Sequence, residues 1–438
     1  METITSYTPS ITSSRKVQRA WAMYDWANSA YNLVITSTIF PAYYNAVTTI
    51  KEDGVVVDDT VNFLGYKVKN SALFDYSIAA AYLIIALISP ILSSIADYRG
   101  NKKTFMQLFC FTGAISCCCL YFFKADTVEL GVICAAIAAL GYCGSLVFYN
   151  AYLPEIALPA ERDRVSALGF SYGYIGSVLL QLICFLFVLQ PQWFGITDDT
   201  FAPRLSFVLV GIWWAAFALI PFAKLPNSIA LPQQAGRSVL TGGFKELNKV
   251  WQQLRHMPKL KTYLASFFFY SMGVQTVMLA ATIFGSKELK LDTGQLIGAI
   301  LVIQLVAILG AYIMAKLSER FGNLQVLFVV VLIWIGVCIA AYYTYTATEF
   351  YIVATVVGII MGGIQSLSRS TYAKLMPPTH DTTSFFSFYD VTEKLAIVIG
   401  MFSFGYIDSI MNMRSAIIAL ITFFTLGALI LYIAMRKK

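Results

Sequence analysis

Long apolar runs limit what this chain can fold into more than any other feature. Only 13% of its 438 residues are charged, against about 25% in soluble domains. Twelve runs are long enough to cross a bilayer as helices: 20–46, 72–96, 104–123, 129–152, 165–190, 205–223, 261–284, 294–316, 325–345, 350–374, 385–407 and 413–435. Because lipid offers no partner to backbone polar groups, we expect an all-α membrane protein.

The distribution of lysine and arginine predicts the orientation. Most of these residues fall in the segments that share a side with both termini, such as 15–19, 99–103 and 436–438. By the positive-inside rule, the N- and C-termini are expected in the cytoplasm.

The longest polar interruption, 224–260, divides the chain. We expect an N-terminal bundle of six helices at 1–223, a cytoplasmic linker at 224–260 and a second six-helix bundle at 261–438. The linker includes a basic amphipathic pattern whose apolar face holds Phe244, Leu247, Trp251 and Leu254. We expect this helix on the inner leaflet, with binding of a partner protein as an alternative.

The first span carries an unusual polar stripe. Asp25, Asn28, Ser29 and Asn32 are spaced i, i+3, i+4 and i+7, so they share one helical face. A carboxylate at the centre of a lipid-exposed helix costs about 2.5–3.5 kcal/mol on insertion scales. The stripe is therefore expected to face protein or water.

The two halves repeat a cytoplasmic turn at an offset of about 222 residues. Asp97-Tyr-Arg99-Gly100-Asn101 follows the second span, and Glu319-Arg320-Phe-Gly322-Asn323 follows the eighth. Internal repeats of this kind are typical of secondary transporters, in which two bundles enclose a site near the middle of the membrane.

The first of these turns resembles the signature of the major facilitator superfamily, although Ser93 and Tyr98 depart from it. Three further segments are similar to the vacuole-effluxer branch: Trp21–Asn32 with Phe40-Pro41, Phe148–Glu155, and Gln365–Ser370 followed by Pro377-Pro378. The resemblance implies the major facilitator fold, alternating access and efflux of small solutes, with amino acids as the best-known case. It also implies that Asp97, Arg99, Gly100, Glu319, Arg320 and Gly322 form conformational signature loops.

In this superfamily the first, fourth, seventh and tenth helices line the central cavity. The polar residues on those helices are candidate substrate-binding residues: Asn28, Asn32, Tyr149, Asn150, Tyr270, Gln275 and Gln365. The alternative for each is an ordinary hydrogen bond between packed helices.

The charged residues within the spans are candidates for coupling or gating. We expect Asp390, Glu393, Lys394 and Arg369 to form a neutral cluster, which is either a lock that also involves Glu319 or a site for coupling or substrate binding. Asp25 then has no evident basic partner, and a buried carboxylate without one is readily protonated. This makes Asp25 the expected proton carrier, or else a gate residue.

Other classes of function find little support. Gly169-Phe-Ser-Tyr-Gly173 matches a hydrolase motif but lies inside a span, where these glycines and Gly176 favour helix packing. Only two histidines are present, both in predicted loops, so we expect no metal site. We also expect no enzyme activity or cofactor, and no nucleic-acid partner because the positive charges are distributed by membrane side. We expect a monomer that moves a small solute, coupled to protons, across a bacterial inner (plasma) membrane. The alternatives are a proton-coupled importer of sugars, peptides or cell-wall fragments, and a solute sensor.

Overall fold

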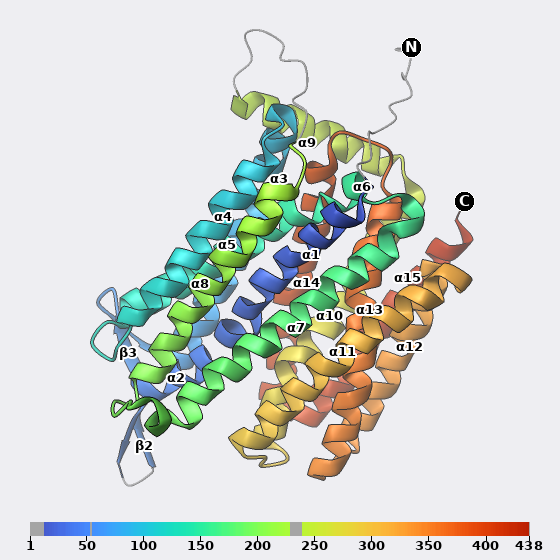
Figure 1. The fold of residues 1–438 in the computed structure, drawn as a ribbon. Coiled ribbons are helices and arrows are strands. Elements are labelled where there is room, and N and C mark those ends of the chain that lie inside the picture. Colours follow the sequence, from blue (N-terminus) through green and yellow to red (C-terminus); the bar gives the residue numbers. More distant parts are fainter. Residues whose placement is uncertain (1–12, 53–54, 228–238, 438) are drawn as a thin grey trace, which may run out of the picture.

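The computed structural model describes residues 13–52, 55–227 and 239–437. They form a helical bundle in which both ends of the described chain lie at the same end of the molecule, the end that lysine and arginine assign to the cytoplasm (Figure 1). Within these described residues, ten helices are long and apolar enough to cross a membrane.

The part of the chain before the central linker contains these elements: α1 (Arg15–Ala30), η1 (Tyr31–Thr38), α2 (Ile39–Thr48), β1 (Ile50–Glu52), β2 (Val55–Asp58), β3 (Thr60–Phe63), β4 (Tyr66–Lys69), α3 (Asn70–Arg99), α4 (Lys102–Cys119), η2 (Leu120–Phe122), α5 (Val128–Asn150), α6 (Leu153–Ile156), η3 (Pro159–Glu161), α7 (Arg162–Leu189), η4 (Pro191–Phe194) and α8 (Phe201–Lys224). We call residues 13–224 the N-half.

The linker and the rest of the chain contain α9 (Val239–Arg255), α10 (Pro258–Lys287), α11 (Thr293–Phe321), α12 (Asn323–Tyr342), α13 (Ala347–Leu375), α14 (Thr382–Ile410) and α15 (Met413–Arg436). We call residues 258–437 the C-half. Every one of the twelve predicted ranges coincides with helical structure.

Two of the twelve predicted spans fall outside the ten that satisfy length and composition. One is the continuous helical segment α1–η1–α2, and the other is α14. The first is interrupted by η1, a π-helix, and the second carries Asp390, Glu393 and Lys394. Polar side chains gather in both segments, and π-helical turns such as η1 are frequent at functional sites.

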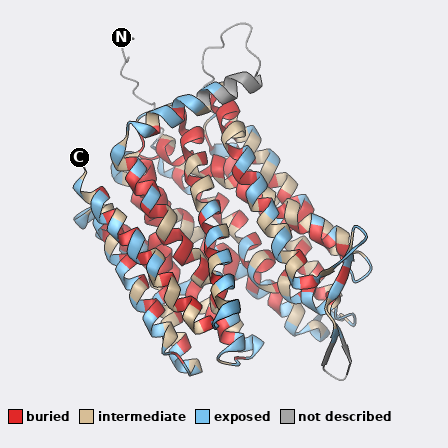
Figure 2. Cartoon of the chain, turned by 180° about the vertical axis from the view of Figure 1, so that it is seen from behind, coloured by how far each residue is buried: buried red, intermediate tan, exposed pale blue. Residues whose placement is uncertain are grey.

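Close contact between α1 and α7 depends on glycine. A Cβ atom at Gly173 would lie 2.5 Å from the Ser29 hydroxyl, and one at Gly176 would lie 2.6 Å from the Trp26 carbonyl oxygen. The helices can approach this closely only because these positions lack side chains, as expected for a small-residue face. Figure 2 shows the resulting distribution, with buried residues toward the interior of the bundle and exposed ones on its outer faces.

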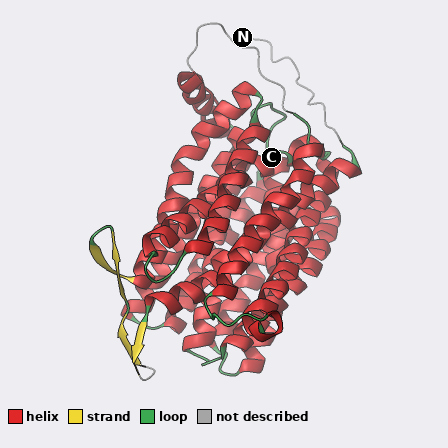
Figure 3. Ribbon diagram, turned by 60° about the vertical axis from the view of Figure 1, so that its left-hand side comes forward, coloured by secondary structure: helices red, strands yellow, loops and turns green. Residues whose placement is uncertain are grey.

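Two short antiparallel hairpins project from the outer end of the N-half, and the sequence did not predict them (Figure 3). In the second, Thr60 pairs with Lys69 and Phe63 with Tyr66. Its two-residue turn places Leu64 and Gly65 at φ +50° and +87°, the left-handed geometry that tight hairpins require.

The linker helix α9 differs from its prediction. It lies across the cytoplasmic end of the bundle and packs against α3, α10 and α14, so one face of it meets protein (Figure 1). Val250 and Leu254 are buried, whereas Trp251 is 43% exposed and stacks on Phe388. Of the predicted face, Leu254 is buried and Leu247 is half-buried, and Val250 is buried in place of Trp251. The side chain of Phe244 and residues 228–238 of the linker lie outside the described residues.

The glycine contacts predict opposite effects of one substitution at two sites. Gly176→Ala forces a methyl group against the Trp26 backbone and is expected to destabilise the protein by about 1–3 kcal/mol. Gly336→Ala, inside α12 with no atom within 4 Å of the new Cβ, is expected to be neutral or to stabilise by up to about 1 kcal/mol. Thermal unfolding in detergent measures both, and equal midpoints would contradict the packing argument.

Candidate functional site

A cavity of about 170 Å³ lies between the two halves of the molecule. Its N-half wall comes from α1, η1, α3, α5 and α7, and its C-half wall from α10, α13 and α14. The polar and aromatic residues that line it are Asp25, Ser29, Asn32, Tyr82, Tyr142, Asn150, Phe170, Phe267, Tyr270, Ser271, Gln275, Gln365, Ser368, Arg369, Tyr389, Glu393 and Lys394. Membrane-embedded polar groups thus converge on one space, where they avoid lipid.

Five of the seven residues that we predicted to bind substrate line this cavity: Asn32, Asn150, Tyr270, Gln275 and Gln365. The other two lie behind its wall. Asn28 is 1% exposed, and Tyr149 is fully buried, stacked on Trp21 and donating a hydrogen bond to Asp25. Tyr149 therefore positions Asp25.

Asp25 and Arg369 form an ion pair that joins the two halves at the cavity wall. The Arg369 Nη1 and Nη2 atoms lie 3.2 and 3.3 Å from Asp25 Oδ2, and the Tyr149 hydroxyl donates to the same oxygen at 2.7 Å. Both charged side chains are less than 10% exposed. Removal of one member of such a buried pair leaves a charge that is costly to keep in place.

Arg369 is held in the N-half by more than its charge. Its guanidinium also donates to the Ser166 hydroxyl at 3.0 Å, to the Ser166 carbonyl at 2.9 Å and to Asn150 Oδ1 at 3.2 Å. The rings of Phe170 and Trp21 lie 4.2 and 4.7 Å from its central carbon. A C-half side chain thus occupies a socket built entirely from N-half residues.

Gly169 makes room for this socket. A Cβ atom there would lie 2.6 Å from Asp25 Oδ2 and 2.9 Å from Arg369 Nη2. The first glycine of the discarded hydrolase motif therefore allows the ion pair to form beside α7.

The pair overturns two expectations from the sequence. Asp25 does have a basic partner, so the stated reason for its protonation was wrong for this state of the protein. Arg369, on α13, does not join Asp390, Glu393 and Lys394 on α14. Its side chain instead extends into the N-half, where it bonds Asp25 and Ser166.

The three remaining charges form a separate cluster on α14. Lys394 Nζ lies 3.3 Å from Asp390 Oδ1 and 3.3 Å from Glu393 Oε2. Asp390 is buried behind the wall, whereas Glu393 faces the cavity and also lies 3.4 Å from the Gln275 amide nitrogen.

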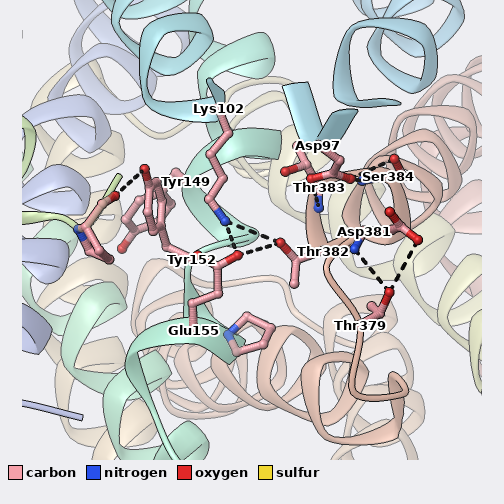
Figure 4. A network of polar contacts seen from close by, with 12 residues as sticks. Asp97, Lys102, Tyr149, Tyr152, Glu155, Thr379, Asp381, Thr382, Thr383 and Ser384 are labelled. Carbon is pink, nitrogen blue, oxygen red and sulfur yellow. Dashed lines mark hydrogen bonds and ion pairs between the residues drawn. The ribbon is translucent and has the colours of Figure 1, made fainter. Parts of the chain in front are cut away.

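Asp97 connects the halves at their cytoplasmic ends (Figure 4). Its carboxylate accepts hydrogen bonds from the backbone N–H groups of Thr383 and Ser384, at 3.2 and 2.7 Å, and from the Ser384 hydroxyl at 2.7 Å. These N–H groups belong to the first turn of α14. Asp97 thus acts as the N-terminal cap of a helix in the opposite half, where the helix dipole favours negative charge.

Two further contacts close the same end. Lys102 pairs with Glu155, whose carboxylate accepts a hydrogen bond from the Thr382 hydroxyl at 2.8 Å (Figure 4). On the other side of the bundle, Asp163 pairs with Lys374 and accepts from the Ser318 hydroxyl at 2.8 Å. The described polar contacts between the halves begin at the cytoplasmic end and extend into the membrane as far as the Tyr174–Gln365 hydrogen bond. The structure therefore represents a state closed on the cytoplasmic side.

The other residues of the signature loops have smaller roles in this state. Gly100 ends α3 at φ +65° and Gly322 ends α11 at φ +87°, positions that suit glycine. Arg99, Glu319 and Arg320 are exposed. The lock that we expected at Glu319 is provided by Asp163, a residue at the start of α7 that helical spacing could not connect to Lys374.

The cavity is suited to bind a polar solute and to expose it to one side of a membrane at a time. The residues that line it come from both halves, and the contacts that close its inner side are ion pairs and hydrogen bonds that can separate as units. Among residues 13–52, 55–227 and 239–437, no group of three His, Cys, Asp or Glu side chains is arranged to hold a metal ion.

Comparison with known proteins identifies the family. Residues 13–438 match the family model described as "Vacuole effluxer Atg22 like". The chain belongs to this family.

Relatives and solved structures agree with that assignment. An uncharacterized MFS-type transporter, YxiO of Bacillus subtilis, is 33% identical over 95% of this chain and 94% of its own length. Autophagy-related protein 22 of Kluyveromyces lactis is 27% identical over 80% of this chain and 77% of its own. The crystal structure of FucP, a major facilitator transporter, superposes with a TM-score of 0.70 at 13% identity, covering 96% of this chain and 99% of FucP.

This member of the vacuole effluxer family is therefore a secondary transporter of the major facilitator superfamily and not an enzyme. Its fold is the all-helical fold predicted from the sequence, embedded in the membrane as a multi-pass protein that takes a small-molecule substrate.

The Asp25–Arg369 pair predicts a coupled effect in this transporter. Asp25→Ala or Arg369→Ala leaves one buried charge unpaired and is expected to cost about 3–5 kcal/mol, while the double variant should cost less than the sum of the two. Thermal unfolding measures the costs. Hydrogen exchange should rise at the inner ends of α7 and α13 in the single variants.

Arg414→Ala is the matched control for this experiment. Arg414 also bonds a carboxylate and two carbonyls, but all of its partners, Glu288, Tyr342 and Thr344, lie within the C-half. Its loss should leave exchange at the inner ends unchanged. Additive costs in the Asp25–Arg369 cycle would rule out a direct interaction.

Proposed function

We propose that the protein exports a small polar solute, an amino acid or a related metabolite, across a bacterial inner (plasma) membrane by proton-coupled alternating access. The observation that carries this proposal is the Asp25–Arg369 ion pair, which joins the two halves at the wall of a cavity lined by both. The family description supports transport of a small solute across a membrane, and the Bacillus subtilis relative supports a bacterial membrane.

Alternating access follows from where the contacts between the halves lie. Opening toward the cytoplasm requires the Asp97, Glu155 and Asp163 contacts to separate, and with them the Arg369 socket. Each contact is a discrete pair that can re-form after release, so the halves can switch between two packed states.

Proton coupling follows from what this separation does to Asp25. In the closed state its carboxylate is neutralised by Arg369 and bonded by Tyr149. When the C-half withdraws Arg369, Asp25 becomes a membrane-embedded carboxylate without a base, and it binds a proton readily. Protonation of Asp25 and its pairing with Arg369 are therefore mutually exclusive, and each favours a different state.

In this cycle, protons and solute cross the membrane in opposite directions. A proton that reaches Asp25 from the outer side weakens the ion pair and favours opening toward the cytoplasm, and it is released on that side when Arg369 returns to Asp25. Solute that binds from the cytoplasm then accompanies the return to the closed inner state. Protons thus move inward as solute moves outward.

Proteoliposomes test this coupling. Vesicles loaded with solute, clamped at zero potential and diluted into solute-free buffer should acidify inside as the solute leaves. Asp25→Asn should abolish this acidification but preserve solute counterflow, because exchange of solute needs no proton step. Asp199→Asn, in an exposed outer loop, is the control and should behave as wild type.

Two outcomes would refute the proposal. Acidification that persists in a folded Asp25→Asn protein removes Asp25 as the proton carrier. Alkalinisation of the wild-type vesicles means that protons travel with the solute, as in an importer of the same fold.

A further inference from the structure

The charges around the cavity do not balance. Among the described residues, Asp25, Asp390 and Glu393 face only two basic side chains, Arg369 and Lys394, in or directly behind the cavity wall. A membrane-embedded site of low dielectric strongly disfavours an uncompensated charge. A bound proton or a bound cation must therefore supply one positive charge at this site.

The surplus negative charge belongs to the α14 cluster. Asp25 and Arg369 match one to one, whereas Lys394 divides its charge between Asp390 and Glu393 at equal distances of 3.3 Å. Asp390 is 2% exposed, and its Oδ2 atom has no hydrogen-bond partner within the described part of the chain. Two carboxylates thus compete for one ammonium group.

Glu393 is the member of the cluster that a solute can reach. Its side chain is 25% exposed, whereas that of Lys394 is 6% exposed. Among the residues that the structure describes, its Oε1 atom has only the long 3.4 Å contact from Gln275. Aromatic side chains, including Tyr270 and Tyr389, line the same cavity, and aromatic rings stabilise cations.

The two basic groups, by contrast, are already paired with carboxylates. Every described hydrogen bond of Arg369 goes to an N-half acceptor, and Lys394 lies between two carboxylates. A solute carboxylate would compete with these partners for the same two basic groups and would add to the surplus of negative charge.

We propose that the transported solute carries a net positive charge and that Glu393 binds its ammonium or guanidinium group. This narrows the proposed function to organic cations, such as amines and basic amino acids, and it rests on that function. The cation supplies the missing charge, and Lys394 then shifts its charge toward Asp390. The binding site for the solute on α14 is distinct from the proton site at Asp25.

Matched ligands on the purified full-length protein test this proposal. Calorimetric titration with L-lysine, L-arginine, cadaverine and choline should show binding by at least one of these cations. L-Norleucine, which has the four-carbon side chain of lysine without the ammonium group, should bind at least about tenfold more weakly, as should L-glutamate. Equal binding of lysine and norleucine, or no binding of any cation at millimolar concentration, would overturn the proposal.

Substitutions at the cluster locate the site. Glu393→Gln should weaken binding of the cation about ten- to a hundredfold, because a charge-assisted contact is lost. Glu393→Asp keeps the charge and should restore part of the affinity, which also separates binding from a failure to fold. Asp199→Asn should leave the affinity unchanged, and unaltered affinity in a folded Glu393→Gln protein would refute the assignment.

The two proposals can fail separately. If a neutral solute drives proton movement that requires Asp25, the exchange mechanism stands and the cationic specificity fails. If cations bind at Glu393 but their efflux moves no protons, the specificity stands and the coupling fails.

Discussion

The cost of ionised groups inside a membrane governs the arrangement of this transporter. An isolated charge there is several kcal/mol unfavourable, so each one must meet a partner of opposite sign or water. Arg369 meets this requirement by reaching out of its own half into a socket formed by Asp25, Asn150 and Ser166. The lowest-energy environment of a C-half residue therefore exists only while the two halves are together, and the charge itself becomes the link between them.

The cytoplasmic contacts extend the same principle to the edge of the membrane. Asp97 caps α14 from the opposite half, and Asp163 joins α7 to the inner ends of α11 and α13. Each of these bonds satisfies a polar group that would be costly to leave unpaired between the packed helix ends. Because several modest contacts act together, no single one has to be strong enough to trap the protein in this state, and their joint release gives a two-state switch.

Patterns within one helix were predictable from sequence, and contacts between helices were not. Apolar runs located all twelve helical segments, and the spacing of Asp25 and Asn32 placed both on the cavity side. The spacing of Asp390 and Lys394 likewise predicted their ion pair. Asp25 and Arg369, however, are 344 residues apart, and helical periodicity says nothing about such a pair. For the same reason, the sequence did not reveal that Asp163 pairs with Lys374, and Glu319 was wrongly expected to form the cytoplasmic lock.

The pairing of Asp25 changes the argument for proton coupling. A carboxylate that is always unpaired would be protonated in every state and could not report on conformation. One that is paired in the closed state and unpaired after opening changes its proton affinity with each transition, which is what coupling requires. Residues that bind solute need no such alternation. The three charges of the α14 cluster all lie in one half and do not depend on contact with the other half, so the cluster can hold a cation while the path to either side of the membrane opens and closes.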